Sequence, residues 1–523
     1  MPVRLSKDFH RVRALPTRSW LDNVKDLTGQ FRRPGGTMTL RPIQSAALAE
    51  IREHGGGFIP ARTGSGKLLL SLLIPQIMNA QRAVIVVPAS RRAPTHAAWL
   101  EYNKHFHLRQ CSVITYSDLS STKSPTMLAD LNPDLMVYDE AHSAKDSEGA
   151  RWRRTRRITK DIPFIAMSGS FANRGLGEWA HLAVRALGEG APVPLDWAEQ
   201  TQWHRGLSTG RDAIDPGCLI DLMPGSSSAQ EAFGRRLIAT PGVVSSGSDV
   251  PDIPLTFGRL HVPPTADQVA LAKYMQDTWL TPCDWPIDTA LDMWRHKREA
   301  GLGFYLRWRD PPPGDWLLAR KEFSCFVREH TSGNWRWDLP TQVIAAVGKG
   351  ELQDYGDVIG RWRAVEPAYT PIMKPVWVTE HVLQAAAKWA RDNRGIVWVT
   401  HQEFGDQLAS MTGMPYCKEG ACDAQGRHIE EIRGPVIASV FSCGTGHNLQ
   451  HHQRNLVTCV PSPILLEQLI SRTHRDGQKS PCHVDFLTSL PSDDVDIDKA
   501  VEDARSVSSQ FSVIQRLIYG EWV

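Results

Sequence analysis

The chain has 523 residues and a hydrophobic content of 41%, which predicts a globular protein of several domains rather than one core. Its formal net charge of +2 excludes an overall basic character, so nucleic-acid binding would depend on a locally basic groove. Nine scattered cysteines predict reduced thiols in a cytoplasmic setting, and Cys417 and Cys422 lack further ligands at zinc-site spacing. The sequence shows no apolar signal segment and no apolar run long enough to cross a bilayer. We therefore expect that the protein is neither secreted nor anchored in a membrane.

Residues 61–67 (ARTGSGK) form a glycine-rich segment between a strand expected at 56–60 and a helix expected at 68–78. Gly64 and Gly66 allow backbone N–H groups to turn inward around an anion, which the helix N-terminus also faces. A glycine turn before a core helix is the alternative. We predict a phosphate-binding loop with ligand contacts from Arg62, Thr63, Gly64, Ser65, Gly66, Lys67 and Leu68, in which Lys67 reaches the outer phosphates.

Leu68 departs from the usual form of such a loop, in which a Ser or Thr at this position binds magnesium. A leucine offers no oxygen to a hard cation. We expect Mg²⁺ to be held by Asp139, the phosphates and waters, with Ser65 as a nearby hydroxyl, and turnover to be slow or to need more magnesium.

Two short apolar runs, at 84–87 and 135–138, are typical of buried parallel strands, and the second leads directly into residues 139–142 (DEAH). A carboxylate at the carboxyl end of a strand points into the crevice where α/β proteins bind ligands. Asp139 is therefore predicted to hold magnesium, and Glu140 to orient or deprotonate the attacking water. The alternative is the solvated end of a strand.

Arg472 and Arg475 lie one helical turn apart within residues 467–478. An arginine on a facing lobe can neutralise the charge that develops on a γ-phosphate. For this segment taken alone, a surface helix with salt bridges is the alternative.

These segments, in this order, resemble those of superfamily 2 helicases, and more closely those of the SWI/SNF-type double-stranded DNA translocases. Further segments carry the resemblance: 40–44, 114–117, 168–173, 442–450 and 468–478. The resemblance implies an ATP site with Mg²⁺, an adenine contact from Gln44, nucleotide contacts from Gly446 and Gln468, and catalytic roles for Lys67, Asp139, Glu140, Arg472 and Arg475. The chain is compact for this group, which suggests a bacteriophage-encoded member.

The expected fold is α/β, with two RecA-like parallel-sheet lobes and a largely helical insertion between them. The expected boundaries are an N-terminal arm at 1–37, lobe 1 at 38–187, a linker and insertion at 188–370, lobe 2 at 371–490 and a C-terminal helical tail at 491–523.

Several basic or aromatic segments are candidates for DNA contact. Residues 151–157 (RWRRTRR) form either a DNA patch or the solvated face of a helix. Lys145 is a further candidate through the resemblance. Trp308, between Arg307 and Arg309, and Trp335, with Arg336 and Trp337, have the composition of stacking platforms, although core positions remain open.

We expect a monomeric ATP hydrolase that moves along duplex DNA, in the cytoplasm of a bacterial or phage-infected cell. Two alternatives remain. One is an unwinding helicase that acts on single-stranded DNA or RNA. The other is a nucleic-acid binding protein with weak or lost ATPase, which Leu68 suggests.

Overall fold

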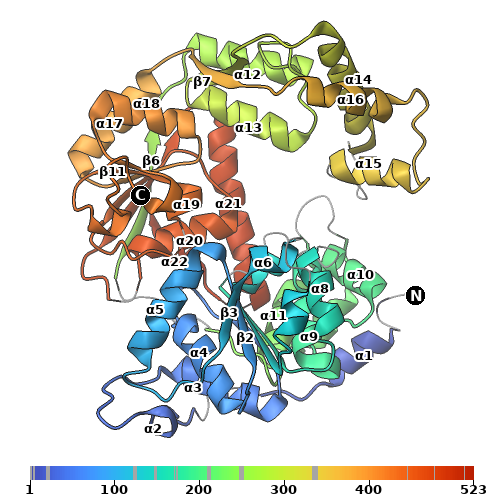
Figure 1. The fold of residues 1–523 in the computed structure, drawn as a ribbon, viewed down its shortest axis with the longest axis vertical. Helices are drawn as coiled ribbons and strands as arrows, with labels where there is room; N and C mark the ends of the chain where they lie inside the picture. Colours follow the sequence, from blue (N-terminus) through green and yellow to red (C-terminus); the bar gives the residue numbers. More distant parts are fainter. Residues whose placement is uncertain are drawn as a thin grey trace.

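The computed structural model describes residues 3, 6–18, 24–121, 126–145, 150–169, 171, 175–208, 214–246, 253–331, 340–444, 446–475, 477–511 and 513–523. These residues form a parallel sheet of five strands, a parallel sheet of seven strands and a two-stranded antiparallel ribbon (Figure 1). The predicted α/β class with parallel sheets is confirmed. None of the described helices combines the length and apolar character that crossing a bilayer requires.

The first sheet has the strand order β1-β5-β4-β2-β3, and helices cover both of its faces. Alternate residues of β2 and β4 enter different cores: Val84 and Val86 pack on one face, and Ile85 and Val87 on the other. Burial on both faces explains why these strands are almost wholly apolar. The strands are β1 (Gly57–Pro60), β2 (Ala83–Val87), β3 (Ser112–Thr115), β4 (Leu135–Asp139) and β5 (Phe164–Ser168).

The helices that accompany this sheet include the predicted helix after the glycine-rich segment, which is α4. Helix α1 (Lys7–Ala14) packs on the face of Val84 and Val86, whereas the other face is covered by α2 (Thr28–Phe31), α3 (Pro42–His54), α4 (Lys67–Ile77) and α5 (Arg92–Tyr102). The remainder are α6 (Tyr116–Ser120), α7 (Met127–Asp130), α8 (Ala150–Ile158), α9 (Ala180–Leu187), α10 (Trp197–Leu207) and α11 (Ala229–Ile238).

The second sheet has the order β10-β11-β9-β12-β13-β6-β14. Its strands are β6 (Leu255–His261), β9 (Ile396–Val399), β10 (Tyr416–Cys417), β11 (Val436–Ser439), β12 (Arg454–Val457), β13 (Cys482–Thr488) and β14 (Glu521–Trp522). The helices around it are α17 (His381–Asn393), α18 (Gln402–Thr412), α19 (Val440–Cys443), α20 (Pro463–Thr473), α21 (Pro491–Phe511) and α22 (Arg516–Tyr519).

The segment predicted as one linker, 188–370, is distributed over three parts of the structure. Helices α10 and α11 pack into the core of the first sheet, and β6 pairs with β13 over seven residues of the second sheet. The remainder projects as a helical insertion with the ribbon strands β7 (Phe304–Trp308) and β8 (Met373–Trp377) at its base (Figure 1). Its helices are α12 (Ala266–Thr278), α13 (Ala290–Gly301), α14 (Gly314–Thr331), α15 (Pro340–Gly348) and α16 (Val358–Val365).

Helix α21 joins the two sheets. Its first half contributes Ile497 and Ala500 to the core of the second sheet, and its last turns contribute Val507 and Phe511 to the core of the first (Figure 1). Gly234 of α11 allows the close approach, because a Cβ there would lie 1.9 Å from the backbone oxygen of Ser509. The chain then returns through α22 to β14 at the edge of the second sheet.

Candidate nucleotide site

The glycine-rich loop lies between the carboxyl end of β1 and the first turn of α4. Gly64 and Gly66 have φ values of +99° and +83°, a conformation that residues with a Cβ rarely adopt. The ammonium of Lys67 lies inside the loop and donates to the carbonyls of Ala61 and Arg62, at 2.9 and 3.2 Å. The geometry is that of an anion cradle at a helix N-terminus, closed around its own lysine.

The predicted contact residues of the loop differ in exposure. Arg62, Ser65 and Lys67 are buried, whereas Thr63 and Leu68 are half-buried. The side chain of Leu68 offers no polar atom to the site, as its chemistry requires.

Gln44 supports the loop from α3. Its amide nitrogen donates to the carbonyl of Gly66 at 2.9 Å, and its amide oxygen accepts from the backbone N–H of Arg41 at 2.9 Å. The guanidinium of Arg41 donates to the carbonyl of Gly64 at 2.7 Å. Gln44, predicted as an adenine contact, therefore fixes the backbone of the glycine-rich loop.

Strand order brings the acidic pair to this loop. Strand β5 lies between β1 and β4, with Pro60 opposite Ser168 and Asp139 opposite Met167, so the three carboxyl ends are level. Glu140 Oε1 lies 3.8 Å from Lys67 Nζ. The predicted metal and water residues thus lie beside the loop.

Two residues without a predicted site role orient Glu140. The Ser168 hydroxyl donates to Glu140 Oε2 at 3.4 Å, and His142 Nδ1 lies 3.5 Å from the same oxygen. Glu140 itself has a φ of +52°, a conformation uncommon outside glycine. The place of Ser168 at the end of a strand is a signal that could have identified it, once the strand order was known.

The two carboxyls differ in their ionisation. Burial and the charge of Glu140 raise the pKa of Asp139, against the influence of Arg91 and Lys67. Burial also opposes ionisation of Glu140, but Lys67, His142 and Arg91 outweigh it and hold the pKa of Glu140 below its ordinary range. Glu140 is therefore ionised, and Asp139 is the carboxyl that a cation would most affect.

Two buried polar atoms at the site fit a hard cation. Asp139 Oδ2 and Ser65 Oγ are buried and hydrogen bond to none of the described residues. Such atoms are costly unless a ligand satisfies them. Both are oxygens, the ligand type that Mg²⁺ prefers, so the donor set suits magnesium although Leu68 replaces the usual hydroxyl.

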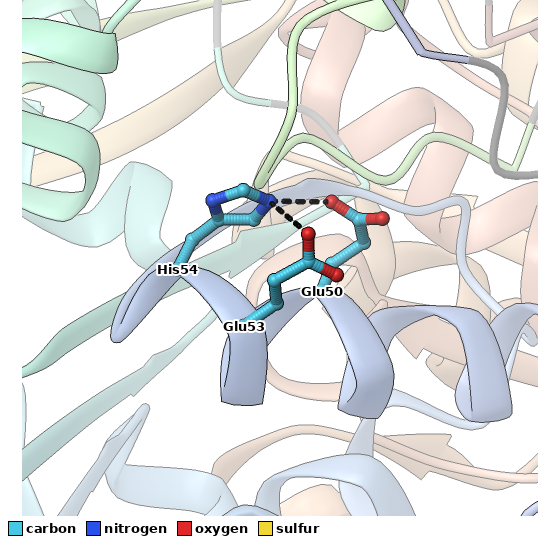
Figure 2. A group of neighbouring side chains, drawn as sticks. All are labelled: Glu50, Glu53 and His54. Atoms are coloured by element: carbon cyan, nitrogen blue, oxygen red, sulfur yellow. Dashed lines mark ion pairs between the residues drawn. The ribbon is translucent and has the colours of Figure 1, made fainter.

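A second cluster with the composition of a metal site lies on α3, where Glu50, Glu53 and His54 converge (Figure 2). His54 Nε2 is 3.3 Å from Glu50 and 3.9 Å from Glu53. Arg18 forms ion pairs with both carboxylates at 3.0 Å, and Glu50 also accepts from the backbone N–H of Gly242 at 2.8 Å. These contacts give the cluster a structural role, which joins the N-terminal segment to the first sheet.

The second sheet faces the site with the end of α20. Arg472 is buried, and it donates from Nε to the Gln468 carbonyl at 2.9 Å and from Nη1 to the His447 carbonyl at 3.4 Å. Burial, Arg91 and Arg475 lower the pKa of Arg472 to about 9, which leaves it charged at neutral pH. Glu140 opposes this shift, so the two sheets meet electrostatically at this point.

The other predicted residues of the second sheet lie at the same edge. Gly446 has a φ of +88°, and a Cβ there would lie 3.5 Å from Cδ of Arg91 on the first sheet. Gln468 is buried, and its carbonyl accepts from Arg472 and from the hydroxyl of Ser471. Helix α20 ends at Thr473, so Arg475 lies beyond the helix and not one helical turn from Arg472 as predicted; it is half-buried.

Arg91 has no role in the sequence prediction, yet it lies between the two sheets. Its charge influences Asp139, Glu140 and Arg472. Its place just beyond the carboxyl end of β2, the neighbour of β4, is the feature that could have identified it.

The candidate residues for DNA contact differ in their exposure and in their contacts within the protein. Arg151 donates to the Ser143 carbonyl at 2.9 Å and Arg154 to the Ser121 carbonyl at 2.9 Å, so these two arginines hold α8 in place, while Arg153, Arg156 and Arg157 are exposed. Lys145 pairs with Glu178 at 3.5 Å.

Of the two alternatives for Trp308, a stacking platform or a core position, the structure shows the core position. The indole is buried and stacks on Trp285 with ring centroids 5.4 Å apart, because the ribbon packs against the insertion there. Trp335, Arg336 and Trp337 lie outside the described residues, as do parts of the segments 168–173 and 442–450.

Comparison with protein-family models and with curated proteins found no match to this chain. Its interpretation therefore depends on the residues and geometry described above.

Proposed function

We propose that this chain is an ATP-driven translocase with two RecA-like lobes, built on the two parallel sheets, that moves along duplex DNA in the cytoplasm of a bacterial or phage-infected cell. The observation that carries the proposal is a convergence across the two sheets. The phosphate loop and the acidic pair of the first sheet lie opposite Arg472 and Gly446 of the second. This set of groups suits phosphoryl transfer to water.

The residues of the first sheet would bind and orient the nucleotide. Lys67 would exchange the carbonyls of Ala61 and Arg62 for the outer phosphates. Asp139 and Ser65 would hold Mg²⁺, which when bound neutralises phosphate charge. Glu140, ionised and oriented by Ser168, would position the attacking water and accept its proton.

Arg472 and Arg475 would supply positive charge from the second sheet as charge develops on the terminal phosphate. Closure of the two lobes would complete this arrangement, and hydrolysis would release it. The choice of duplex DNA is supported by the resemblance of residues 468–478, with the helical insertion as the element that would embrace the duplex. Backbone contacts would make binding sequence-tolerant and salt-sensitive.

The test is ATP turnover by the full chain, measured alone and with equal concentrations of duplex DNA, single-stranded DNA and RNA, with Glu140→Gln as the inactive control. We expect the strongest stimulation from duplex DNA. Stimulation by single-stranded DNA or RNA alone would favour the unwinding helicase. Binding without turnover under every condition would identify a nucleic-acid binding protein.

A further inference from the structure

Arg91 is positioned by both sheets. It ends the short helical turn η2 (Ala89–Arg91), which follows β2 and precedes α5. Because β2 pairs with β4, this turn lies beside Asp139 and Glu140. On the second sheet, Gly446 has only a hydrogen where a Cβ would lie 3.5 Å from Cδ of Arg91. The first sheet thus extends an arginine to the Gly-rich turn of the second.

The charge of Arg91 influences the ionisation of three groups of the site. It favours ionisation of Asp139 and Glu140 and disfavours that of Arg472. No described residue accepts a hydrogen bond from the Arg91 guanidinium, so its donors are available to a ligand. Arg472 differs, since two of its nitrogens donate to carbonyls of its own half of the molecule.

The adjacent Arg92 provides a contrast. Its side chain is 56% exposed and lies 3.6 Å from Asp118, away from the acidic pair. Two neighbouring arginines of the same turn therefore have different surroundings, and only Arg91 lies between the sheets.

We propose that Arg91 binds the terminal phosphate of ATP and so distinguishes ATP from ADP. This inference rests on the proposed function. The backbone of the glycine-rich loop would contact phosphates common to both nucleotides, whereas Lys67, Glu140 and Arg472 would surround the terminal phosphate. A charge-assisted contact there is available only to the triphosphate.

The test compares the affinities of the full-length protein for a non-hydrolysable ATP analogue and for ADP, both with Mg²⁺, by isothermal titration calorimetry. We expect Arg91→Ala to weaken binding of the analogue about tenfold, the loss of one charge-assisted contact, and to change ADP binding less than about twofold. Arg91→Lys should recover part of the preference, and Arg92→Ala should leave both affinities unchanged.

An equal effect of Arg91→Ala on both nucleotides, or no effect on either, would overturn the inference. If Arg91→Ala does not fold, Arg91→Gln decides in the same way. If the wild type binds and hydrolyses ATP, and Arg91→Ala and Arg91→Gln still prefer the ATP analogue to ADP as the wild type does, this inference alone is overturned. A wild type that binds neither nucleotide overturns it together with the proposed function.

Discussion

The two sheets bring different groups to the point where they meet. On the first sheet, Asp139 Oδ2 and Ser65 Oγ are buried polar atoms that hydrogen bond to no described residue. On the second, Arg472 already donates to the carbonyls of Gln468 and His447. The first edge thus has buried oxygens that are suited to hold a ligand. The second edge presents the positive charge of Arg472, which is already held in place and would be drawn towards a bound anionic ligand. Under the proposed function, the first sheet would mainly bind the nucleotide and the second would respond to it.

The connection between the sheets agrees with this division. Helix α21 packs in both cores, with Phe511 stacked near Phe171 and Trp179 of the first. Movement of one edge relative to the other would therefore act on this helix and on its contact with α11.

The largest expected effect comes from the second edge. Arg475→Ala should lower ATP turnover by about 10³–10⁵-fold, because it removes positive charge needed only as the terminal phosphate departs. Single-turnover hydrolysis measures the rate. Nucleotide affinity and the thermal midpoint serve as controls and should change little, since this side chain is half-buried. If a loss of nucleotide affinity accounts for the whole effect, the second sheet takes part in binding, which contradicts the division of roles between the two sheets.

On the first edge, Glu140→Gln should lower turnover by about 10²–10⁴-fold and leave ATP binding nearly intact, because only proton transfer and water orientation are lost. Steady-state kinetics and nucleotide titration measure the two quantities. Glu101→Gln, in an exposed pair with Lys104, is the matched control. Hydrolysis by Glu140→Gln at the wild-type rate would remove Glu140 from the site.

The second sheet should be the more sensitive to acid through His452, which is 3% exposed. Burial and the neighbouring His451 lower the pKa of His452 from 6.5 to about 4. The unfolded chain therefore binds a proton first, so this contribution to stability is complete above pH 6.5 and is lost as the pH falls towards 4. The loss amounts to about 3 kcal/mol.

Urea unfolding at a series of pH values measures this loss, with a probe in each half of the molecule. His452→Gln should flatten the dependence in this range. An unchanged slope in that variant would assign the acid sensitivity to other groups.

The smallest expected effect is at Leu68. Leu68→Thr should lower the magnesium concentration for half-maximal turnover by a factor of about ten or less, because a hydroxyl joins Asp139 and Ser65 as an oxygen ligand. Leu68→Ala separates this gain from a steric effect. If the wild type is already fast at low magnesium and the threonine changes nothing, another oxygen ligand must be sought.

The sequence by itself determined the local parts of the site. Gly64 and Gly66 have the positive φ that the loop requires, and the strand and helix around them follow from short-range periodicity. The apolar run of β4 likewise predicted that Asp139 ends a buried strand. These features depend on neighbours in the chain, so no long-range contact was needed to predict them.

Only the tertiary structure decided which of these parts meet. Strand β5 lies between β1 and β4, and this order brings Ser168 to Glu140. Pairing of β6 with β13 assigns part of the expected linker to the second sheet. Packing buries Trp308, and the approach of the sheets places Arg91 at Gly446. The physical reason is that strand order and packing between sheets depend on residues hundreds of positions apart, which local composition and periodicity do not encode.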